Sequence, residues 1–321
     1  LRPSRLHNLN YVTNDLFGRI KLENYKTNKI DREKAVSYIK GFIDQPKSPS
    51  DFTFEKHTNH FKNLIKSLLQ LPIYCFLVAL RTVIFRKKLS KFTLTKFKHK
   101  LLFVNSTFQK IITSRKKENF SNYNLKYIYF PLHVDPESST MVDAQIYTNQ
   151  LFVIETLLKS MPNDFYLVVK EHFPMVGIRK KSFYRRLNSL PRLILANYNQ
   201  NQFDIIKNSK FVATITGTVG IEALMLSKPV ILFGNTLYEN IDEGILKVKD
   251  LNNLKKEITK FKYDKQILKK NLIKYFSILF NISFELDDEL YWGEKFSKAS
   301  FEKKDNLFKS LYNSIEKTVK L

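Results

Sequence analysis

The chain has 321 residues, 43% hydrophobic and 14% aromatic, so it can build a sizeable core and is not disordered throughout. Its 54 lysine and arginine residues outnumber 30 acidic ones, and the net charge of +24 indicates either a lysine-rich surface or an anionic partner. The single cysteine, Cys75, excludes an internal disulfide framework and fits a reducing compartment.

The first 120 residues are expected to be mostly helical. A helix is expected near Arg32–Ile43, followed by a linker-like segment at Gln45–Ser50 that contains two prolines. Residues 61–120 continue the helical pattern and end in a basic, polar stretch. Because the chain opens without an initiator methionine or a signal peptide, we expect that its original N-terminus is missing.

An apolar run at Leu68–Leu80 is followed by a basic tract. The run has 13 residues and contains Pro72, whereas a transmembrane helix needs roughly 20 apolar residues. The segment is therefore either a core helix with a solvated basic end or a contact with an anionic membrane surface. Nucleic acid is not expected as a partner, because the aromatic residues do not alternate with the basic ones. The basic tract contains Arg81, Arg86, Lys87, Lys88, Lys91, Lys96, Lys98 and Lys100.

From Tyr123 onward, strands and helices alternate, which predicts a Rossmann-like, doubly wound parallel sheet over residues 121–250. The predicted strands are Tyr127–Leu132, Phe165–Val169, Arg192–Ala196, Phe211–Ile215, Pro229–Gly234 and a short one near Leu246–Val248. The predicted helices cover residues 146–158, the region of Phe183, Leu187 and Leu190, Gln202–Asn208, and a segment starting near Val219. Residues 251–321 are expected to be mostly charged helices.

Residues 211–234, FVATITGTVGIEALMLSKPVILFG, predict a strand, a tight turn at Thr216–Thr218, a helix and a second strand. A helix that starts behind such a turn has unpaired N–H groups, and its dipole favours an anion there. The segment therefore indicates a phosphate site for a nucleotide or sugar phosphate. The alternative is an ordinary turn in which glycine supplies a positive φ.

Ligands of doubly wound sheets bind outside the carboxyl ends of the strands. Two histidines, several acidic residues and a lysine follow those ends in this chain. They are His133, Asp135 and Glu137 after the first strand, and Lys170, Glu171 and His172 after the second. A histidine at a strand end can be structural, but two histidines and a phosphate-type turn on the same edge favour a catalytic role for His133 and His172. No metal is expected, because no HExxH or CxxC spacing occurs.

Three motifs in this order resemble the capsule polysaccharide synthesis family: YFPLHVDPESST, LVVKEH with a nearby proline and arginine, and ATITGTVGIEALMLSKPVILFG. That family includes β-Kdo (3-deoxy-manno-octulosonic acid) transferases. The resemblance covers about residues 125–240 and implies a GT-B glycosyltransferase. On this basis residues 121–250 would bind the nucleotide sugar, and residues 1–120 would be the end of the acceptor half and its connector.

The resemblance also implies roles for individual residues. Donor contacts would come from the turn and its surroundings, namely Lys170, Thr216, Gly217, Thr218, Gly220 and Glu222, the last bonding a ribose or anchoring the turn. The family's Lys-Glu-His-Pro carries an extra Phe173 here, and His172 remains a phosphate contact or acid. Kdo transferases have a glutamine and, four residues later, a catalytic aspartate where this chain has His133 and Glu137. Glu137 is thus the expected nucleophile, with Asp135 as the alternative.

The implied reaction is retaining transfer of Kdo or a related ulosonic acid from a CMP-linked donor, with no cofactor, to a glycolipid or oligosaccharide acceptor. It would take place in the cytoplasm, at the inner face of the cytoplasmic membrane. Two alternatives remain open: an epimerase-like enzyme acting on a sugar nucleotide, and a non-catalytic sugar-nucleotide-binding component of polysaccharide assembly or export.

Overall fold

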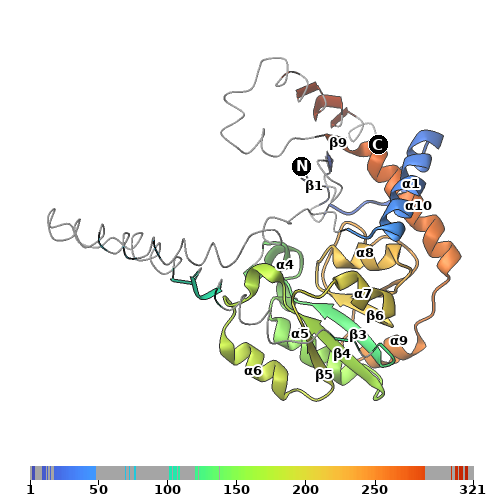
Figure 1. Ribbon diagram of the computed structural model, residues 1–321. Coiled ribbons are helices and arrows are strands. Elements are labelled where there is room, and N and C mark those ends of the chain that lie inside the picture. The colour runs from blue at the N-terminus through green and yellow to red at the C-terminus, as the bar shows by residue number, and fades with distance from the viewer. Residues whose placement is uncertain are drawn as a thin grey trace.

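The computed structural model describes residues 18–47 and 120–285 apart from 122 and 137, together with isolated positions elsewhere. Figure 1 shows a layered α/β body with helices packed around one sheet. The expected nucleophile Glu137 and most of the apolar run and basic tract at residues 68–100 lie outside the described residues. Within the described part of the chain, no helix is long and apolar enough to cross a bilayer.

The body contains a six-stranded, wholly parallel sheet with the order β5-β4-β3-β6-β7-β8. Numbered along the chain, this is the 3-2-1-4-5-6 order of dinucleotide-binding folds, which reverses direction between β3 and β6. The predicted Rossmann-like fold is confirmed, and each predicted strand lies within two residues of an observed one. The strands are β3 (Lys126–Pro131), β4 (Phe165–Lys170), β5 (Leu193–Ala196), β6 (Phe211–Thr214), β7 (Val230–Leu232) and β8 (Ile245–Lys247).

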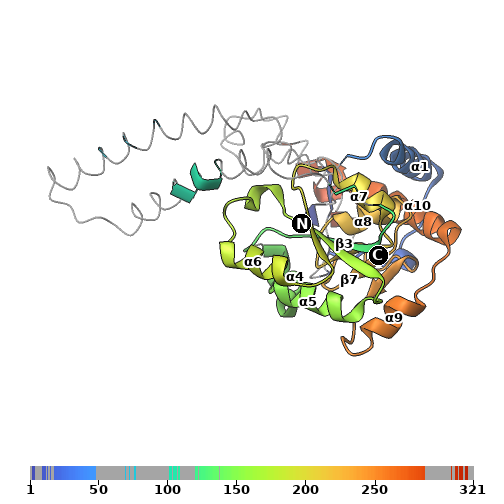
Figure 2. The same cartoon turned by 60° about the horizontal axis from the view of Figure 1, so that its bottom comes forward.

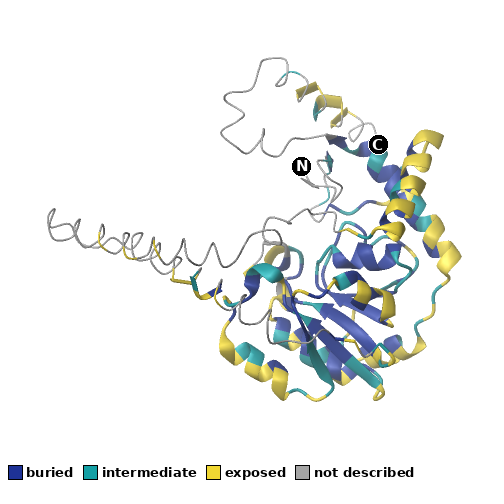
Figure 3. Ribbon diagram, viewed as in Figure 1, coloured by how far each residue is buried: buried dark blue, intermediate teal, exposed yellow. Residues whose placement is uncertain are grey.

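Both faces of this sheet are covered, as the apolar strand sequences require. Along β3, Ile128 and Phe130 enter one core cluster, while Tyr127 and Tyr129 enter the other, because alternate side chains point to opposite faces. All four side chains are fully buried, and Figure 3 shows the strands buried beneath partly exposed helices.

One face is covered by α5 (Gln150–Ser160), α6 (Lys181–Ser189) and α9 (Leu254–Lys260). The other is covered by α7 (Gln202–Asn208), α8 (Val219–Met225), α10 (Lys265–Ile282) and α1 (Lys29–Asp44). Shorter elements are β1 (Arg2–Pro3), β2 (Leu9–Tyr11), η1 (Leu22–Asn24), α4 (Ser138–Asp143), η3 (Gln145–Tyr147), η4 (Phe173–Met175) and β9 (Phe284–Glu285).

The predicted helix over residues 146–158 is divided in the structure. A 3-10 turn covers Gln145–Tyr147, and α5 begins only at Gln150. The Asn149 side chain caps α5 by accepting hydrogen bonds from the N–H groups of Leu151 and Phe152. Ile146 consequently lies off the helix face, with 79% of its side chain exposed.

The helix expected near Arg32–Ile43 is α1, and it packs alongside α10 in both Figure 1 and Figure 2. Tyr38 of α1 contacts Phe276 and Phe280 of α10, with ring centroids 5.1 and 5.9 Å away. Segments 220 or more residues apart in the chain thus share one core, which supports the sheet from behind α8.

Candidate functional site

The residues predicted at the carboxyl edge follow the ends of β3, β4 and β6, as expected from the parallel sheet. His133, just beyond β3, is buried at the point where the strand order reverses. Its Nε2 accepts a hydrogen bond from the N–H group of Ile215 at 3.2 Å and lies 3.4 Å from the Thr214 hydroxyl. The imidazole therefore ties the end of β3 to the end of β6.

Burial, followed by the neighbouring charges of His172 and Arg179, lowers the pKa of His133 to about 3. The ring is therefore neutral at physiological pH. Since Nε2 accepts a backbone N–H, the ring has a structural contact at this edge, and the predicted catalytic role of His133 stays a prediction.

The Gly217 turn lies directly over His133. The N–H group of Gly217 donates to the Thr214 hydroxyl at 3.0 Å, and its carbonyl accepts from the Tyr238 hydroxyl at 2.6 Å. A Cβ atom on Gly217 would lie 2.8 Å from Thr214 Oγ1 and 3.0 Å from His133 Cε1. Gly217 is not among the residues with positive φ, so glycine is required here for space and not for a left-handed backbone.

Beyond Gly217 the turn retains hydrogen-bond donors. Within the described residues, the N–H groups of Thr218 and Val219 donate to no protein acceptor. The Thr216 hydroxyl is also buried without a hydrogen-bond partner among those residues. Thr218 itself is only partly buried and its side chain does not cap α8. The two N–H groups, unlike the buried Thr216 hydroxyl, are the donors on which a proposal of an anionic ligand can rest.

Gly220 and Glu222 were also predicted to contact the nucleotide-sugar donor, but both are more buried than residues 216–218. A Cβ atom on Gly220 would be 2.1 Å from the Tyr238 hydroxyl, so this glycine makes room for Tyr238. Glu222 is 1% exposed, and its carboxylate accepts a hydrogen bond from Gln202 of α7 at 3.0 Å. In this structure Gly220 leaves space for Tyr238, which bonds the turn, and Glu222 connects α8 to α7.

The end of β4 forms a buried ionic cluster. Glu171 pairs with Arg179 at 2.8 Å and accepts hydrogen bonds from the Tyr184 hydroxyl at 2.6 Å and from the N–H of His172 at 2.7 Å. Arg179 also donates to the carbonyl of His133 at 2.6 Å. The cluster thereby connects the loop after β4 to the loop after β3.

Two predicted residues remain accessible beside this cluster. The Asp135 side chain is 57% exposed, with Arg179 Nη1 3.5 Å away, and His172 is exposed. Lys170, the last residue of β4, is partly buried. A cavity of about 220 Å³ opens at the ends of β4 and β5, lined by residues that include Glu171, Arg179, Lys181, Tyr184, Asn188 and Tyr198.

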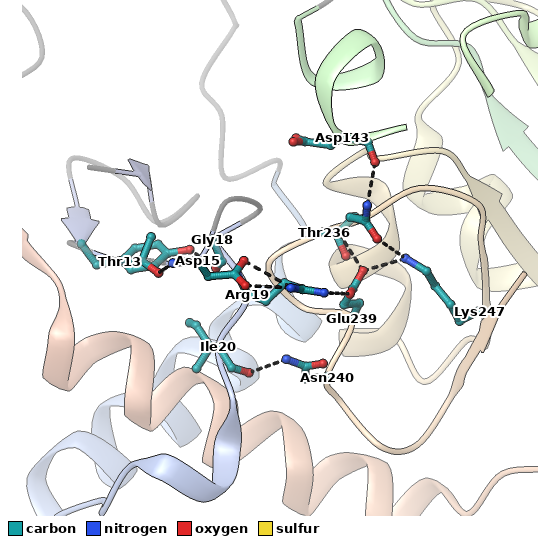
Figure 4. Close-up of polar contacts among 12 residues, drawn as sticks. Thr13, Asp15, Gly18, Arg19, Ile20, Asp143, Thr236, Glu239, Asn240 and Lys247 are labelled. Atoms are coloured by element: carbon teal, nitrogen blue, oxygen red, sulfur yellow. Dashed lines mark hydrogen bonds and ion pairs between the residues drawn. The ribbon is translucent and has the colours of Figure 1, made fainter. Parts of the chain in front are cut away.

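A second polar network lies at the ends of β7 and β8 (Figure 4). Glu239 accepts from Lys247 at 2.7 Å and pairs with Arg19 of the N-terminal segment at 3.4 Å. Lys247 also donates to Asn235 at 3.0 Å, and the Asn235 amide donates to the carbonyl of Asp143 at 3.1 Å. This network fixes the loop at residues 234–241, which carries Tyr238.

Tyr238 and this network were not singled out from the sequence, and Arg179 entered only as the arginine near the LVVKEH motif, without a role. Arg179 lies eight residues after its partner Glu171, and Arg19 lies 220 residues before Glu239. No local pattern links such pairs. Among the described residues, no group of three or more His, Cys, Asp and Glu side chains is arranged to hold a metal ion.

Comparison with known proteins identifies a family whose model matches this chain. The family model described as "Capsule polysaccharide biosynthesis protein" matches residues 12–279, most of the chain. Protein FixF of Sinorhizobium fredii is 35% identical over 102 residues, which is 32% of this chain and 24% of that protein. The capsule polysaccharide export protein KpsS of Escherichia coli is 31% identical over 105 residues, covering 32% and 26%.

The matched stretch thus spans about a quarter of the length of these two relatives. Among solved structures, the Thermosulfurimonas dismutans KpsC, a beta Kdo 2,7 transferase, is similar with 15% identity and a TM-score of 0.34. That similarity covers 61% of this chain and 56% of the KpsC chain.

Proposed function

The chain belongs to the capsule polysaccharide biosynthesis family, and we propose that it is a glycosyltransferase whose carboxyl sheet edge binds a nucleotide-sugar donor. The observation that carries this proposal is the pair of N–H groups of Thr218 and Val219, which have no protein acceptor within the described residues. They lie at the switch point between β3 and β6, where doubly wound sheets bind their ligands.

In this proposal the donor phosphate contacts Thr216–Thr218, and Lys170 and His172 stabilise it as it departs. The donor is Kdo or a related ulosonic acid linked to CMP. Glu137 attacks the anomeric carbon while the bond from that carbon to the CMP phosphate oxygen breaks. The acceptor hydroxyl then displaces the carboxylate and loses its proton, so the anomeric configuration is retained.

The hydrogen-bonded cluster at this edge supports the proposal. His133 and Arg179 connect the loops after β3, β4 and β6, and Asp135 and His172 at the ends of β3 and β4 are exposed. The 220 Å³ cavity at the ends of β4 and β5 offers room for part of the donor. Residues 121–250 would then be the donor half of a GT-B enzyme, acting on a glycolipid or oligosaccharide at the inner membrane face.

The phosphate role of the turn is tested by calorimetry with CMP and UDP. Thr218→Glu should abolish nucleotide binding, because the carboxylate occupies the place of the ligand's charge. Ser189→Glu, which adds the same charge at the exposed end of α6, is the matched control and should bind normally. Equal nucleotide affinity in wild type and Thr218→Glu would remove the turn from the site.

Transfer is tested separately, with CMP-Kdo and an oligosaccharide acceptor. Glu137→Gln should retain donor binding and lose transfer by several orders of magnitude, because the amide cannot form the glycosyl ester. Near-normal transfer by this variant would point to Asp135 as the nucleophile. The anomeric configuration of the product, read by NMR, decides between retention and inversion.

A second function is favoured by one observation, the naming of the Escherichia coli relative as an export protein. On that alternative the chain binds a sugar nucleotide without transferring it. The two functions separate in one experiment: nucleotide binding that is sensitive to Thr218→Glu, with no transfer by the full-length protein, would support the binding component.

A further inference from the structure

The opposite, amino edge of the sheet contains a larger cavity of about 530 Å³. It lies between the starts of β3, β4, β6 and β7 and the connection from α9 to α10. We call it the amino-edge pocket, and its lining includes Lys126, Lys210, Lys228, Lys265, Phe261 and Tyr263. Its volume lies within the range of small-molecule sites, roughly 300–1,000 Å³.

The lining of this pocket has an unbalanced charge. Its four lysines come from four separate segments, and the one carboxylate that lines it among the described residues, Asp164, is already paired with Lys126 at 2.6 Å. In the part of the chain that the structure describes, Lys210, Lys228 and Lys265, which all line the cavity, form no ion pair with a carboxylate.

Lys228 is the least exposed of the three. Its Nζ donates to the carbonyl of Ser209 at 3.2 Å, and burial, followed by the charges of Lys210 and Lys265, lowers its pKa. The turn that carries Lys228 is held in place, because the Tyr263 hydroxyl donates to the carbonyl of Ser227 at 2.7 Å. A bound anion would relieve the repulsion between the lysines without any rearrangement of the backbone.

One wall of the pocket is aromatic. The rings of Phe261 and Tyr263 are stacked with centroids 6.2 Å apart, and Phe261 also contacts Phe211 at 5.7 Å. We propose that the amino-edge pocket binds a phosphate group, with the three lysines as its counter-charges. The phosphate belongs either to a soluble phosphorylated compound or to an anionic phospholipid headgroup. This site is separate from the proposed donor turn, which lies at the other end of the same strands.

The first test titrates inorganic pyrophosphate into protein with 13C-methylated lysines at 150 mM salt, where general surface attraction is screened. All proteins carry Thr218→Glu, so that the carboxyl edge does not contribute. The Lys210→Met/Lys228→Met variant should bind at least tenfold more weakly than its parent. The control Lys255→Met/Lys256→Met removes the same charge from exposed positions of α9 outside the pocket and should stay within twofold.

Equal weakening in both pairs would show diffuse attraction and overturn the proposal, as would the absence of pyrophosphate binding in the parent together with vesicle sedimentation that does not depend on the pocket. If Lys210→Met/Lys228→Met does not fold, Lys210→Met/Lys265→Met changes only exposed side chains and gives the same comparison. Because Thr218→Glu is present throughout, failure of the donor proposal leaves this result unaffected.

The second test identifies the source of the phosphate. Vesicles of phosphatidylcholine with and without phosphatidylglycerol are sedimented with the parent and the pocket variant. Loss of phosphatidylglycerol-dependent sedimentation in the pocket variant assigns the site to a headgroup. Pocket-dependent pyrophosphate binding with unchanged sedimentation assigns it to a soluble phosphate compound. No pocket dependence in either experiment refutes the site.

Discussion

At the scale of single residues, the switch point depends on a buried neutral histidine. His133 accepts the N–H of Ile215 and supports Gly217 from below. Its position after the first strand was predictable from the apolar run that precedes it. Its burial was not, because it depends on Thr214 and Arg179, which are far away in the sequence.

This burial predicts a pH dependence of stability. The folded-state pKa of His133 is about 3, below the unfolded value of about 6.5, so between these values only the unfolded chain takes up the proton. Stability therefore falls as pH decreases from about 6.5 towards 3, by up to about 1.4 kcal/mol per pH unit. His133→Asn should be less stable than wild type at pH 7 but should lose less stability between pH 7 and 4.5. Denaturant unfolding at both pH values measures this, and parallel losses in the two proteins would contradict it.

Gly217 predicts a steric effect. Gly217→Ala forces a methyl group against Thr214 Oγ1 and His133 Cε1 and should destabilise the protein by about 1–3 kcal/mol. A methyl group added to Gly41 of α1 would meet no atom within 4 Å, so Gly41→Ala should stabilise by up to about 1 kcal/mol through helix propensity. Thermal unfolding compares the two. An unchanged melting temperature for Gly217→Ala would mean that the turn can move enough to accommodate the methyl group.

At the scale of elements, the loop at residues 234–241 contacts four other segments of the chain. Tyr238 donates to Gly217 of the turn, Glu239 pairs with Arg19 of the N-terminal segment and Lys247 of β8, and Asn235 donates to Asp143 of α4. The strands were predictable because each is a short apolar run between turn residues. The start of α5 was not, because the Asn149 cap overrides the apolar spacing around Ile146.

The loop predicts a separation between stability and binding. Tyr238→Phe removes one hydrogen bond to a carbonyl and should cost about 0.5–1.5 kcal/mol of stability. Tyr263→Phe removes a matching bond, from a tyrosine hydroxyl to the Ser227 carbonyl at 2.7 Å, at the opposite edge of the sheet. Both should lower the melting temperature similarly, but only Tyr238→Phe should weaken CMP binding. An equal loss of CMP affinity in both variants would exclude a specific effect through the turn.

At the scale of the whole molecule, α1 near the start of the chain and α10 near its end pack into one hydrophobic core. The core that contains α8 also takes in Ile39 and Phe42 of α1 and Phe276 and Leu279 of α10. Burial, followed by the charge of Glu222 in α8, raises the pKa of Tyr38 to about 12. The sequence predicted α1 and the late helices separately, but amphipathic patterns do not specify which helices pair, so their contact was visible only in the structure.

This closure predicts that α10 depends on α1 for its stability. Tyr38→Ala removes the ring that packs on Phe276 and Phe280 and should cost about 1–3 kcal/mol, less than a fully buried aromatic residue. Because about 1.4 kcal/mol corresponds to a tenfold change in an opening equilibrium, amide exchange in α10 should accelerate by roughly fivefold to somewhat more than a hundredfold. Val36→Ala, at a side chain of α1 that is 44% exposed, is the control and should leave exchange in α10 nearly unchanged. If Tyr38→Ala speeds amide exchange in α1 alone, the local stability of α10 comes from its packing against α8 and does not depend on α1.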